Sequence, residues 1–426
     1  MKTGKILYIH IIGLWGIKDI ETKFDPNVNI FIGPNGSNKT VFLNLLEAAL
    51  NVDLEILCNT DFKRIEIHID ADVSILIIEN IASEDSTTTI KYSLDDDEFL
   101  LQMMPFRMRH LHRYEEPQEN VLRRRLAQIV NISWLSVNRG TTDIQYLDSR
   151  EVLERIKNMV DIKIERLVKL LGGYQLQLET EANTISNDFK KEVMAMMLYD
   201  PNIDSYNNDI LKDLSTVDIN DLRKQLYKAF STLGIAKENL PSIEMHLRKI
   251  RDVLRKMSQI NTTLELNDVF ILALVKRTLS IIDISQNHER QTKELYTPIN
   301  NFWKCLMRFM PNKKFVYDNE RGILTVTLLE VEHSDVSIPL SALSSGEKQI
   351  FILLTEALLQ REKNYLFIAD EPELSLHIKW QKKILPELFA INPNAQIIVA
   401  THSPEVASNY PDKIINMSNI IKNHVQ

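Results

Sequence analysis

The sequence contains little cysteine: Cys58 and Cys305 are the only two in 426 residues. Two cysteines are too few for a disulfide framework or for a zinc site held by thiolates. Such sparing use of cysteine is typical of proteins in a reducing compartment. We therefore expect a cytoplasmic protein.

Long apolar runs are missing as well. No stretch approaches the roughly 18 consecutive apolar residues that are needed to cross a bilayer, so we expect no membrane partner. The apolar N-terminal stretch Ile6–Leu14 is interrupted by His10, and no small-residue cleavage site follows it. It predicts a buried strand rather than a secretory signal.

The third absence is an excess of positive charge. The chain has 50 Lys and Arg against 58 Asp and Glu, a formal net charge of −8. A surface with this balance does not attract nucleic acid as a whole, so DNA binding would require a local basic patch.

The spacing of apolar residues predicts three parts. Residues 1–149 and 312–426 alternate short β-rich runs with helices, which predicts two halves of one α/β head with a mostly parallel central sheet and additional antiparallel strands. Residues 150–311 predict a helical insertion. Its apolar stripes extend over five to six turns at most, which favours a compact insertion with short paired arms. We expect one helix to end at Gly172-Gly173 and another to begin at Thr297 and Pro298.

The segment Gly33–Thr40 (GPNGSNKT) stands between an apolar strand and a helix. A glycine-containing turn at such a junction presents backbone N–H groups and a helix N-terminus to phosphate. We expect Lys39 to bind the β- and γ-phosphates of ATP, and the Thr40 hydroxyl to ligate Mg²⁺. The other residues expected to contact the nucleotide in this loop are Asn35, Gly36, Ser37 and Asn38.

Asn38 occupies the position before the lysine, where glycine is usual. Asparagine is among the non-glycine residues that most readily adopt a positive φ. We therefore expect nucleotide binding to persist, with slow or altered turnover.

Two carboxylates follow the apolar strand Tyr365–Ala369. We expect Asp370 to hold Mg²⁺ through water and Glu371 to act as the general base on the attacking water, a role that contributes about 10²–10⁴-fold in rate. An isolated Asp-Glu pair is usually a solvated loop. Its place downstream of a phosphate loop favours the catalytic interpretation.

The segment Leu343–Gln349 (LSSGEKQ) predicts a helix start, and taken alone it is a good N-cap. Together with the phosphate loop it resembles the signature motif of ABC ATPases. That resemblance implies that its residues meet the γ-phosphate held by a second copy, so that ATP closes a homodimer. These residues are Ser344, Ser345, Gly346 and Glu347. His402, just past the apolar run Gln396–Ala400, resembles the switch histidine of the same class, which contacts the γ-phosphate and steadies the water.

Several segments are similar to the OLD, RecF and SMC-like branch of ABC ATPases. Asp370–His377 (DEPELSLH) looks like the D-loop region of that branch, and Ile9–Phe24 followed by Asn29–Thr40 resembles its opening. Ile132–Arg139 resembles a strand-then-arginine element of OLD-type ATPases. The resemblance covers roughly residues 1–145 and 312–415, and it implies an ABC ATPase head.

OLD nucleases carry a Toprim nuclease domain after the switch histidine. Here about two dozen residues follow His402, and they contain no acidic metal-binding cluster. The chain therefore resembles stand-alone ATPase subunits of anti-phage systems such as PARIS and Septu, with PARIS preferred. This implies a homo-oligomer larger than the ATP-bridged dimer and a separately encoded nuclease effector, of the Toprim type in PARIS.

Two basic clusters stand out in this acidic chain. The first consists of Arg107, Arg109, His110, His112, Arg113, Arg123, Arg124 and Arg125. The second consists of His246, Arg248, Lys249, Arg251, Arg255 and Lys256. The first is explained more simply as a solvated helix face paired with nearby glutamates. The alternative is a surface for DNA or for an acidic phage protein that imitates DNA.

Two functions remain open from the sequence. One is a regulatory ATPase scaffold that senses infection and controls a nuclease. The other is a RecF-like DNA-repair clamp that grips DNA directly. A transporter subunit fits less well, because the insertion, the D-loop and the opening strands all differ.

Overall fold

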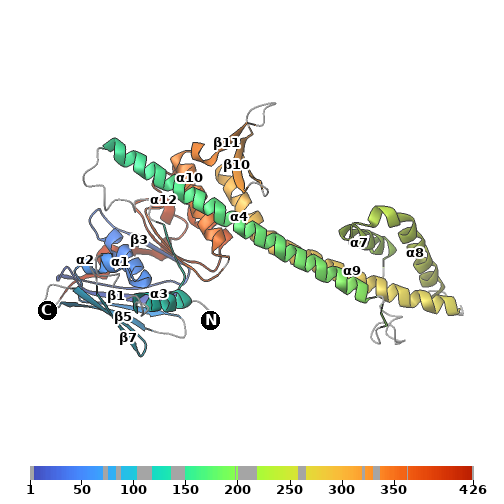
Figure 1. The fold of residues 1–426 in the computed structure, drawn as a ribbon, viewed down its shortest axis with the longest axis horizontal. Helices are drawn as coiled ribbons and strands as arrows, with labels where there is room; N and C mark the ends of the chain where they lie inside the picture. The colour runs from blue at the N-terminus through green and yellow to red at the C-terminus, as the bar shows by residue number, and fades with distance from the viewer. Residues whose placement is uncertain are drawn as a thin grey trace, which may run out of the picture. The chain divides into compact units, whose positions relative to one another are not determined.

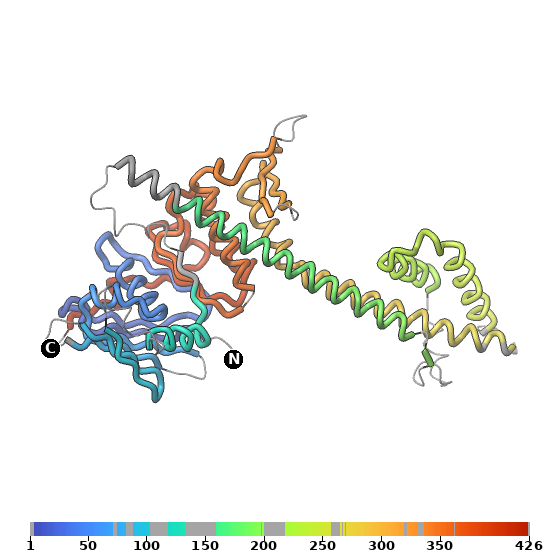
Figure 2. Tube along the Cα trace, viewed as in Figure 1, coloured from blue at the N-terminus to red at the C-terminus, as the bar shows by residue number. Residues whose placement is uncertain are grey.

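The computed structural model describes residues 4–70, 75–82, 88–102, 118–135, 149–196, 198–199, 218–257, 265–318, 322–329, 336–361 and 363–424. They divide into two compact units. The head unit consists of Met1–Gly172 and Ile299–Gln426, and the insert unit consists of Gly173–Pro298. One part of the head unit is thus N-terminal and the other is C-terminal, as the blue and red segments of Figure 2 show.

The centre of the head unit is a five-stranded sheet whose described pairings are all parallel. In order across the sheet its strands are β14 (Ile414–Asn416), β3 (Val28–Ile32), β13 (Gln396–Ala400), β12 (Leu366–Asp370) and β8 (Ile132–Leu135). Buried parallel strands are expected to be apolar on both faces, and β13 is buried along its whole length. The predicted α/β head with a mostly parallel central sheet is confirmed. Residues 136–139 of the expected strand-then-arginine element lie outside the described residues.

A second sheet of the head unit has seven strands, all antiparallel. In order they are β15 (Ile421–Asn423), β2 (Lys18–Lys23), β1 (Ile6–Leu14), β4 (Arg64–Ile69), β5 (Ile75–Ala82), β6 (Thr88–Leu94) and β7 (Asp97–Gln102). Strand β1 confirms the buried strand that was expected at Ile6–Leu14. Asp95 and Asp96 form the turn between β6 and β7, which begins at Asp97.

Helix α1 (Lys39–Asn51) packs between these two sheets (Figure 1). One continuous core joins Phe42 and Leu46 of α1 with Ile67 of β4 and Ile368 of β12. Helices α2 (Leu54–Asn59) and α3 (Gln118–Ile129) contact α1 and the antiparallel sheet. Because α1 is buried on most of its circumference, its N-terminus is held at a fixed place on the parallel sheet.

Gln396, at the start of β13, connects the two sheets. Its fully buried side chain accepts a hydrogen bond from the Ile6 N–H at 2.8 Å and donates to the Ile6 carbonyl at 2.8 Å. It also donates to the Asp25 carbonyl at 2.9 Å. A single amide therefore satisfies three buried backbone groups where the sheets meet.

The head unit also contains a small antiparallel sheet and the helices that follow it. The sheet is formed by β9 (Lys313–Asp318), β10 (Ile323–Leu328) and β11 (Ser337–Pro339). The helices are α10 (Ser345–Leu359), α11 (Ile378–Ile391), α12 (Pro404–Ala407) and α13 (Met417–Ile420), with short 3₁₀ turns at Leu340–Ala342 and Pro411–Lys413.

The insertion is helical as expected, but its helices are longer than the sequence suggested. Helix α4 (Ser149–Ala195) has 47 residues and α9 (Leu266–Phe309) has 44. At 1.5 Å per residue, each is about 65–70 Å long, so the expectation of short arms was wrong. Between them, α7 (Ile219–Thr232) and α8 (Ala236–Met257) pack on α9 around an apolar core in the insert unit.

Two expected helix ends are in fact helix interiors. A Cβ at Gly172 would lie 1.9 Å from the Tyr317 hydroxyl, so this glycine allows close approach of β9 and does not end α4. Pro298 lies inside α9, and the Thr297 hydroxyl donates to the Lys293 carbonyl at 2.6 Å, four residues back, instead of capping a helix start.

The described helices include none whose length and apolar character together would allow it to span a bilayer.

We predict that Gln396→Leu lowers the free energy of unfolding by roughly 3 kcal/mol, because three buried backbone groups lose their partner. Chemical denaturation would measure this loss. Gln128→Leu is the matched control, since Gln128 of α3 is exposed and its change should stay within about 0.5 kcal/mol. Equal effects of the two substitutions would contradict the role given to Gln396.

Candidate functional site

The predicted site residues gather at one edge of the parallel sheet. Strands β3, β13 and β12 are adjacent and parallel, so their carboxyl ends lie side by side. Ala400 pairs in register with both Phe31 and Asp370. The loops that follow these strands carry the phosphate loop, the two carboxylates and His402, as is usual for ligand sites on parallel sheets.

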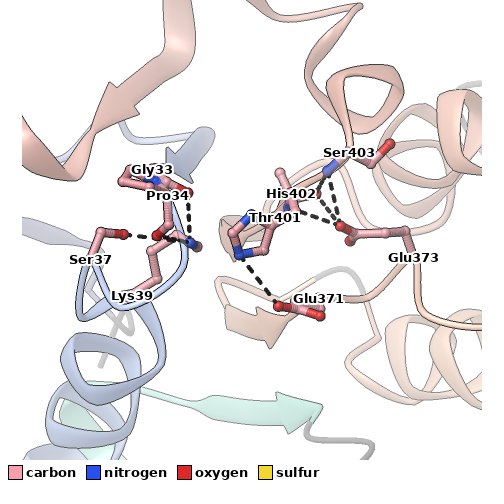
Figure 3. Close-up of polar contacts among 9 residues, drawn as sticks. All are labelled: Gly33, Pro34, Ser37, Lys39, Glu371, Glu373, Thr401, His402 and Ser403. Atoms are coloured by element: carbon pink, nitrogen blue, oxygen red, sulfur yellow. Dashed lines mark hydrogen bonds and ion pairs between the residues drawn. The ribbon is translucent and has the colours of Figure 1, made fainter.

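Lys39 fills the phosphate loop with its side chain. Its ammonium donates to the Gly33 carbonyl at 2.9 Å, to the Pro34 carbonyl at 3.3 Å and to the Ser37 hydroxyl at 3.5 Å (Figure 3). Burial lowers the pKa of Lys39, and the nearby carboxylates of Glu371 and Asp370 oppose that effect. A buried cation surrounded by weak acceptors is suited to exchange them for the oxygens of an anion.

Asn38 is the N-cap of α1 and has a φ of 67°, in the left-handed region. Its conformation agrees with the expectation that asparagine replaces glycine here by adopting positive φ. With its amide oxygen facing Lys18, Asn38 accepts from the Lys18 ammonium at 3.2 Å, and its amide nitrogen donates to the Gly36 carbonyl at 3.3 Å. In this orientation the Asn38 side chain connects Gly36 of the loop with Lys18 of β2.

Asp370 lies at the tip of β12, in hydrogen-bond contact with the Thr40 hydroxyl. Burial raises its pKa, and the Glu371 carboxylate adds to that shift, while Thr40 and Lys39 oppose it. The Asp370 Oδ1 atom is buried and has no hydrogen-bond partner among the described residues. An unsatisfied carboxylate oxygen next to a hydroxyl fits the oxygen ligands that Mg²⁺ requires.

Glu371 and His402 face each other across this edge. The His402 Nε2 atom is 3.7 Å from the Glu371 Oε1 atom, and the pair points toward Lys39 on the opposite side (Figure 3). The backbone of Glu371 has a φ of 49°, and its N–H donates to the Ala400 carbonyl at 2.8 Å. Positive φ in a non-glycine residue is costly, and such strain is concentrated at functional sites.

Glu373 is a residue of this site that the sequence did not single out. Its buried Oε1 atom accepts from the backbone N–H of His402 at 3.1 Å, the N–H of Ser403 at 3.2 Å and the Thr401 hydroxyl (Figure 3). These three bonds fix the turn that carries His402. Nothing in the sequence marked Glu373, because a carboxylate beside two others is normally solvated.

Gln381 extends the same network. It accepts from the Ser403 hydroxyl at 2.7 Å and donates to the Leu376 carbonyl at 3.0 Å. The segment Glu371–His377 and the His402 turn are therefore cross-linked by buried or half-buried polar groups. They line a surface hollow of about 480 Å³.

The predicted signature segment begins α10 and forms a complete capping box. The Ser344 hydroxyl accepts from the Glu347 N–H at 3.4 Å, and the Ser344 N–H donates to the Glu347 carboxylate at 2.9 Å. Ser344 and Ser345 are exposed. A Cβ at Gly346 would lie 2.6 Å from the Ser375 carbonyl, so the helix start packs directly on the segment Glu371–His377.

The signature segment remains separate from the phosphate loop. Among the described residues, no hydrogen bond or ion pair joins Ser344–Glu347 to residues 33–40. The structure thus brings together Lys39, Thr40, Asp370, Glu371 and His402, whereas the signature residues pack on Ser375 in the segment that follows Glu371.

Helix α10 is also tied to α4. The buried Lys348 ammonium pairs with Asp161 at 2.6 Å, and Lys163 pairs with Glu356 at 2.9 Å. Both pairs lie within the head unit, so the base of α4 and the signature helix are held together there.

The described part of the first basic cluster is engaged in local contacts. Arg123 donates to the Val52 carbonyl at 2.9 Å and pairs with Glu119, while Arg125 pairs with Asp97 and lies over the Phe99 ring. These contacts favour the interpretation of a paired helix face. Residues 107–113 lie outside the described residues.

The sequence profile of the AAA ATPase domain matches residues 5–407, which includes every part of the site. The chain belongs to the AAA ATPase domain family. The expected fold class, an ABC-type α/β head with a helical insertion, is consistent with this membership.

Two relatives are similar to parts of this ATPase. It is 26% identical over 154 residues to the Retron Ec83 probable ATPase of Escherichia coli, covering 32% of this chain and 28% of that protein. It is 37% identical over 81 residues to the phosphonates import ATP-binding protein PhnC of Treponema denticola, covering 18% of this chain and 30% of that protein. The ATPase thus aligns with less than a third of the length of either relative.

Among solved structures, the Smc head domain with an extended coiled coil from Pyrococcus furiosus, bound to the C-terminal domain of ScpA, aligns with 97% of this chain and 93% of its own. The TM-score is 0.44 and the identity is 15%. The SMC head domain from Thermotoga maritima aligns with 96% of this chain and 92% of its own, with a TM-score of 0.39 and 10% identity.

We predict that Glu373→Ala reduces the ATPase turnover number by about 10- to 100-fold while changing nucleotide affinity by less than about threefold, because it frees the His402 turn without touching the phosphate loop. Steady-state kinetics and equilibrium nucleotide binding would separate the two effects. Glu373→Gln keeps an acceptor oxygen and should restore most of the turnover. Wild-type turnover in Glu373→Ala, or equal loss in both variants, would contradict a positioning role.

Proposed function

We propose that this ATPase is the ATP-binding and hydrolysing regulatory subunit of an anti-phage defence complex that controls a separately encoded nuclease. The observation that carries the ATP-dependent part is the gathering of Lys39, Asp370, Glu371 and His402 at one sheet edge, apart from an exposed signature segment. Such a site is complete for binding ATP and incomplete for enclosing it.

Within one copy, each group has a role that follows from its contacts. Lys39 and the N–H groups from Asn35 to Asn38 bind the phosphates at the start of α1. Thr40 and Asp370 would hold Mg²⁺, which would neutralise part of the charge of the phosphates. Glu371 accepts a proton from the attacking water, and His402, fixed by Glu373, orients the γ-phosphate and that water.

A second copy of the chain would complete the site. The exposed N-terminus of α10 carries a positive partial charge and two serine hydroxyls, which suit it to a γ-phosphate presented by another subunit. Leu374 and Ile378 are 39% and 58% exposed beside the hollow next to His402. Apolar side chains at this place support a contact that is buried when two copies meet.

The proposal of a regulatory role is based on the similarity to a retron ATPase and on Asn38 in the phosphate loop. The relative named as a retron ATPase supports a role outside transport, and the match to PhnC covers only 18% of this chain. Asn38, at a position where glycine is usual, supports slow turnover, and slow turnover suits a regulatory switch. The preferred effector is a Toprim-type nuclease, as in PARIS, and the preferred assembly is larger than a dimer.

The alternative is a RecF-like clamp that binds DNA directly. The second basic cluster, on α8, is the feature that favours it, because several of its side chains are exposed. Arg123 and Arg125 make local contacts, so the first basic cluster gives less support to DNA binding.

We predict that Glu371→Gln binds ATP with near wild-type affinity, hydrolyses it at least about 100-fold more slowly and accumulates as a closed dimer, because only the base is lost. Light scattering with ATP and Mg²⁺ would detect the dimer. Normal turnover in this variant would refute the assignment of Glu371 as the base.

Two further variants serve as controls for the dimer. Adding Ser344→Arg to Glu371→Gln should abolish dimer formation and leave ATP binding intact, because the arginine obstructs only the trans contact. Lys39→Ala should abolish ATP binding itself. A dimer that persists in the Ser344→Arg variant would exclude the signature segment from the interface.

We predict that the chain expressed with its neighbouring genes co-purifies with a nuclease, and that double-stranded DNA does not stimulate the ATPase activity of the isolated chain. Affinity purification with mass spectrometry, and ATPase assays with and without DNA, would measure the two outcomes. Stimulation by DNA without any partner would favour the clamp instead.

A further inference from the structure

Lys18 of β2 is a cation that lies beside the phosphate loop but outside it. Successive side chains of a strand point to opposite faces, so Lys18 shares a face of β2 with the buried residues Ile20 and Thr22. On that face Ile20 packs in the core that α1 joins, and the N-cap of α1 is Asn38. The Lys18 ammonium is therefore directed at the start of α1, where the Asn38 amide oxygen accepts from it at 3.2 Å.

Lys18 has no acidic partner in the part of the chain that the structure describes. Its neighbour Asp19 points to the opposite face of β2, where it pairs with His424. The other group close to the Lys18 ammonium is the Trp15 ring, whose centroid is 5.6 Å away. A neutral amide binds an ammonium more weakly than an anion does. Lys18 is thus suited to exchange the amide of the loop for a phosphate oxygen.

The turn that leads into Lys18 has an unusual backbone. Trp15 has a φ of 53°, although its side chain is 41% exposed. Two hydrogen bonds of 2.8 Å hold this turn: the Trp15 N–H donates to the Asp61 carbonyl, and the Gly13 N–H donates to the Asp19 carboxylate. Positive φ is costly for a bulky side chain, and such strain is concentrated at functional sites.

His424 holds the residues on both sides of Lys18. Its backbone N–H donates to the Ile17 carbonyl at 2.8 Å, and its Nδ1 atom lies 2.8 and 3.0 Å from the two Asp19 carboxylate oxygens. The Lys63 ammonium is 3.0 Å from Nε2. Because an ammonium only donates and a carboxylate only accepts, Nε2 accepts from Lys63 and Nδ1 donates to Asp19. His424, directly after β15, therefore fixes the backbone that carries Lys18.

We propose that Lys18 is a second cation of the nucleotide site, which binds a phosphate oxygen in addition to Lys39, and that His424 positions it. This inference rests on the ATP site proposed above. When phosphate enters the loop, the Lys18 ammonium leaves the Asn38 amide for an anionic oxygen. His424 touches no phosphate and acts only by keeping Lys18 beside the start of α1.

Equilibrium binding of ATP and of inorganic triphosphate tests the role of Lys18. Lys18→Met should weaken the binding of both ligands by at least about tenfold, because the contact is with phosphate and a charged partner is lost. Lys23→Met is the matched control, since Lys23 is exposed on the opposite face of the same strand. It should leave both affinities unchanged.

A double-mutant cycle tests the positioning role of His424. His424→Ala should weaken ATP binding by about three- to tenfold in the wild-type background and by less than about twofold in the Lys18→Met background, because it acts through Lys18. His424→Asn keeps a donor toward Asp19 and should restore most of the affinity. Thermal unfolding of each variant would establish that it is folded.

Wild-type affinity for ATP in Lys18→Met would overturn the role of Lys18. A loss confined to ATP, with triphosphate bound normally, would overturn it as well and assign the turn to the nucleoside. Equal losses from His424→Ala in the two backgrounds would exclude positioning through Lys18. Lys39→Ala separates these outcomes from a failure of the ATP site itself, because ATP binding that survives this substitution would contradict the proposed function.

Discussion

The parallel pairing of β3, β13 and β12 is the constraint on which the rest of the head unit depends. Three loops that are far apart in the sequence reach one sheet edge because these strands are neighbours and share a direction. Helix α1, buried between two sheets, then fixes the orientation of the phosphate loop. A slip of one residue in either pairing would turn Asp370 or His402 away from Lys39.

Around that edge, buried polar groups connect loops that would otherwise move separately. Glu373 holds the turn of His402, and Gln381 links this turn to the segment before α11. Gly346 allows the signature helix to pack on Ser375 of the same segment. The groups that would face the two sides of a shared nucleotide are therefore joined by direct contacts, without a mobile linker between them.

The head and insert units obtain their stability in different ways. The head unit joins two sheets through α1 and through the single buried amide of Gln396. The insert unit has a small helical core and leaves apolar and basic side chains exposed above it. The exposed side chains of the insert unit are available for binding a partner. The buried side chains of the head unit, in contrast, are needed for the packing that positions the site.

The sequence by itself determined the α/β head, the helical insertion and membership in an ATPase class, because strand periodicity and the phosphate loop are local patterns. It also predicted that Asn38 could adopt positive φ, a property of one residue and its backbone. Only the tertiary structure decided that α4 continues through Gly172. The glycine is there because a larger side chain would clash with Tyr317, a residue distant in the chain. The role of Glu373 could not be predicted from the sequence for the same reason. It depends on the backbone N–H groups of residues 402 and 403, which only folding brings to the carboxylate.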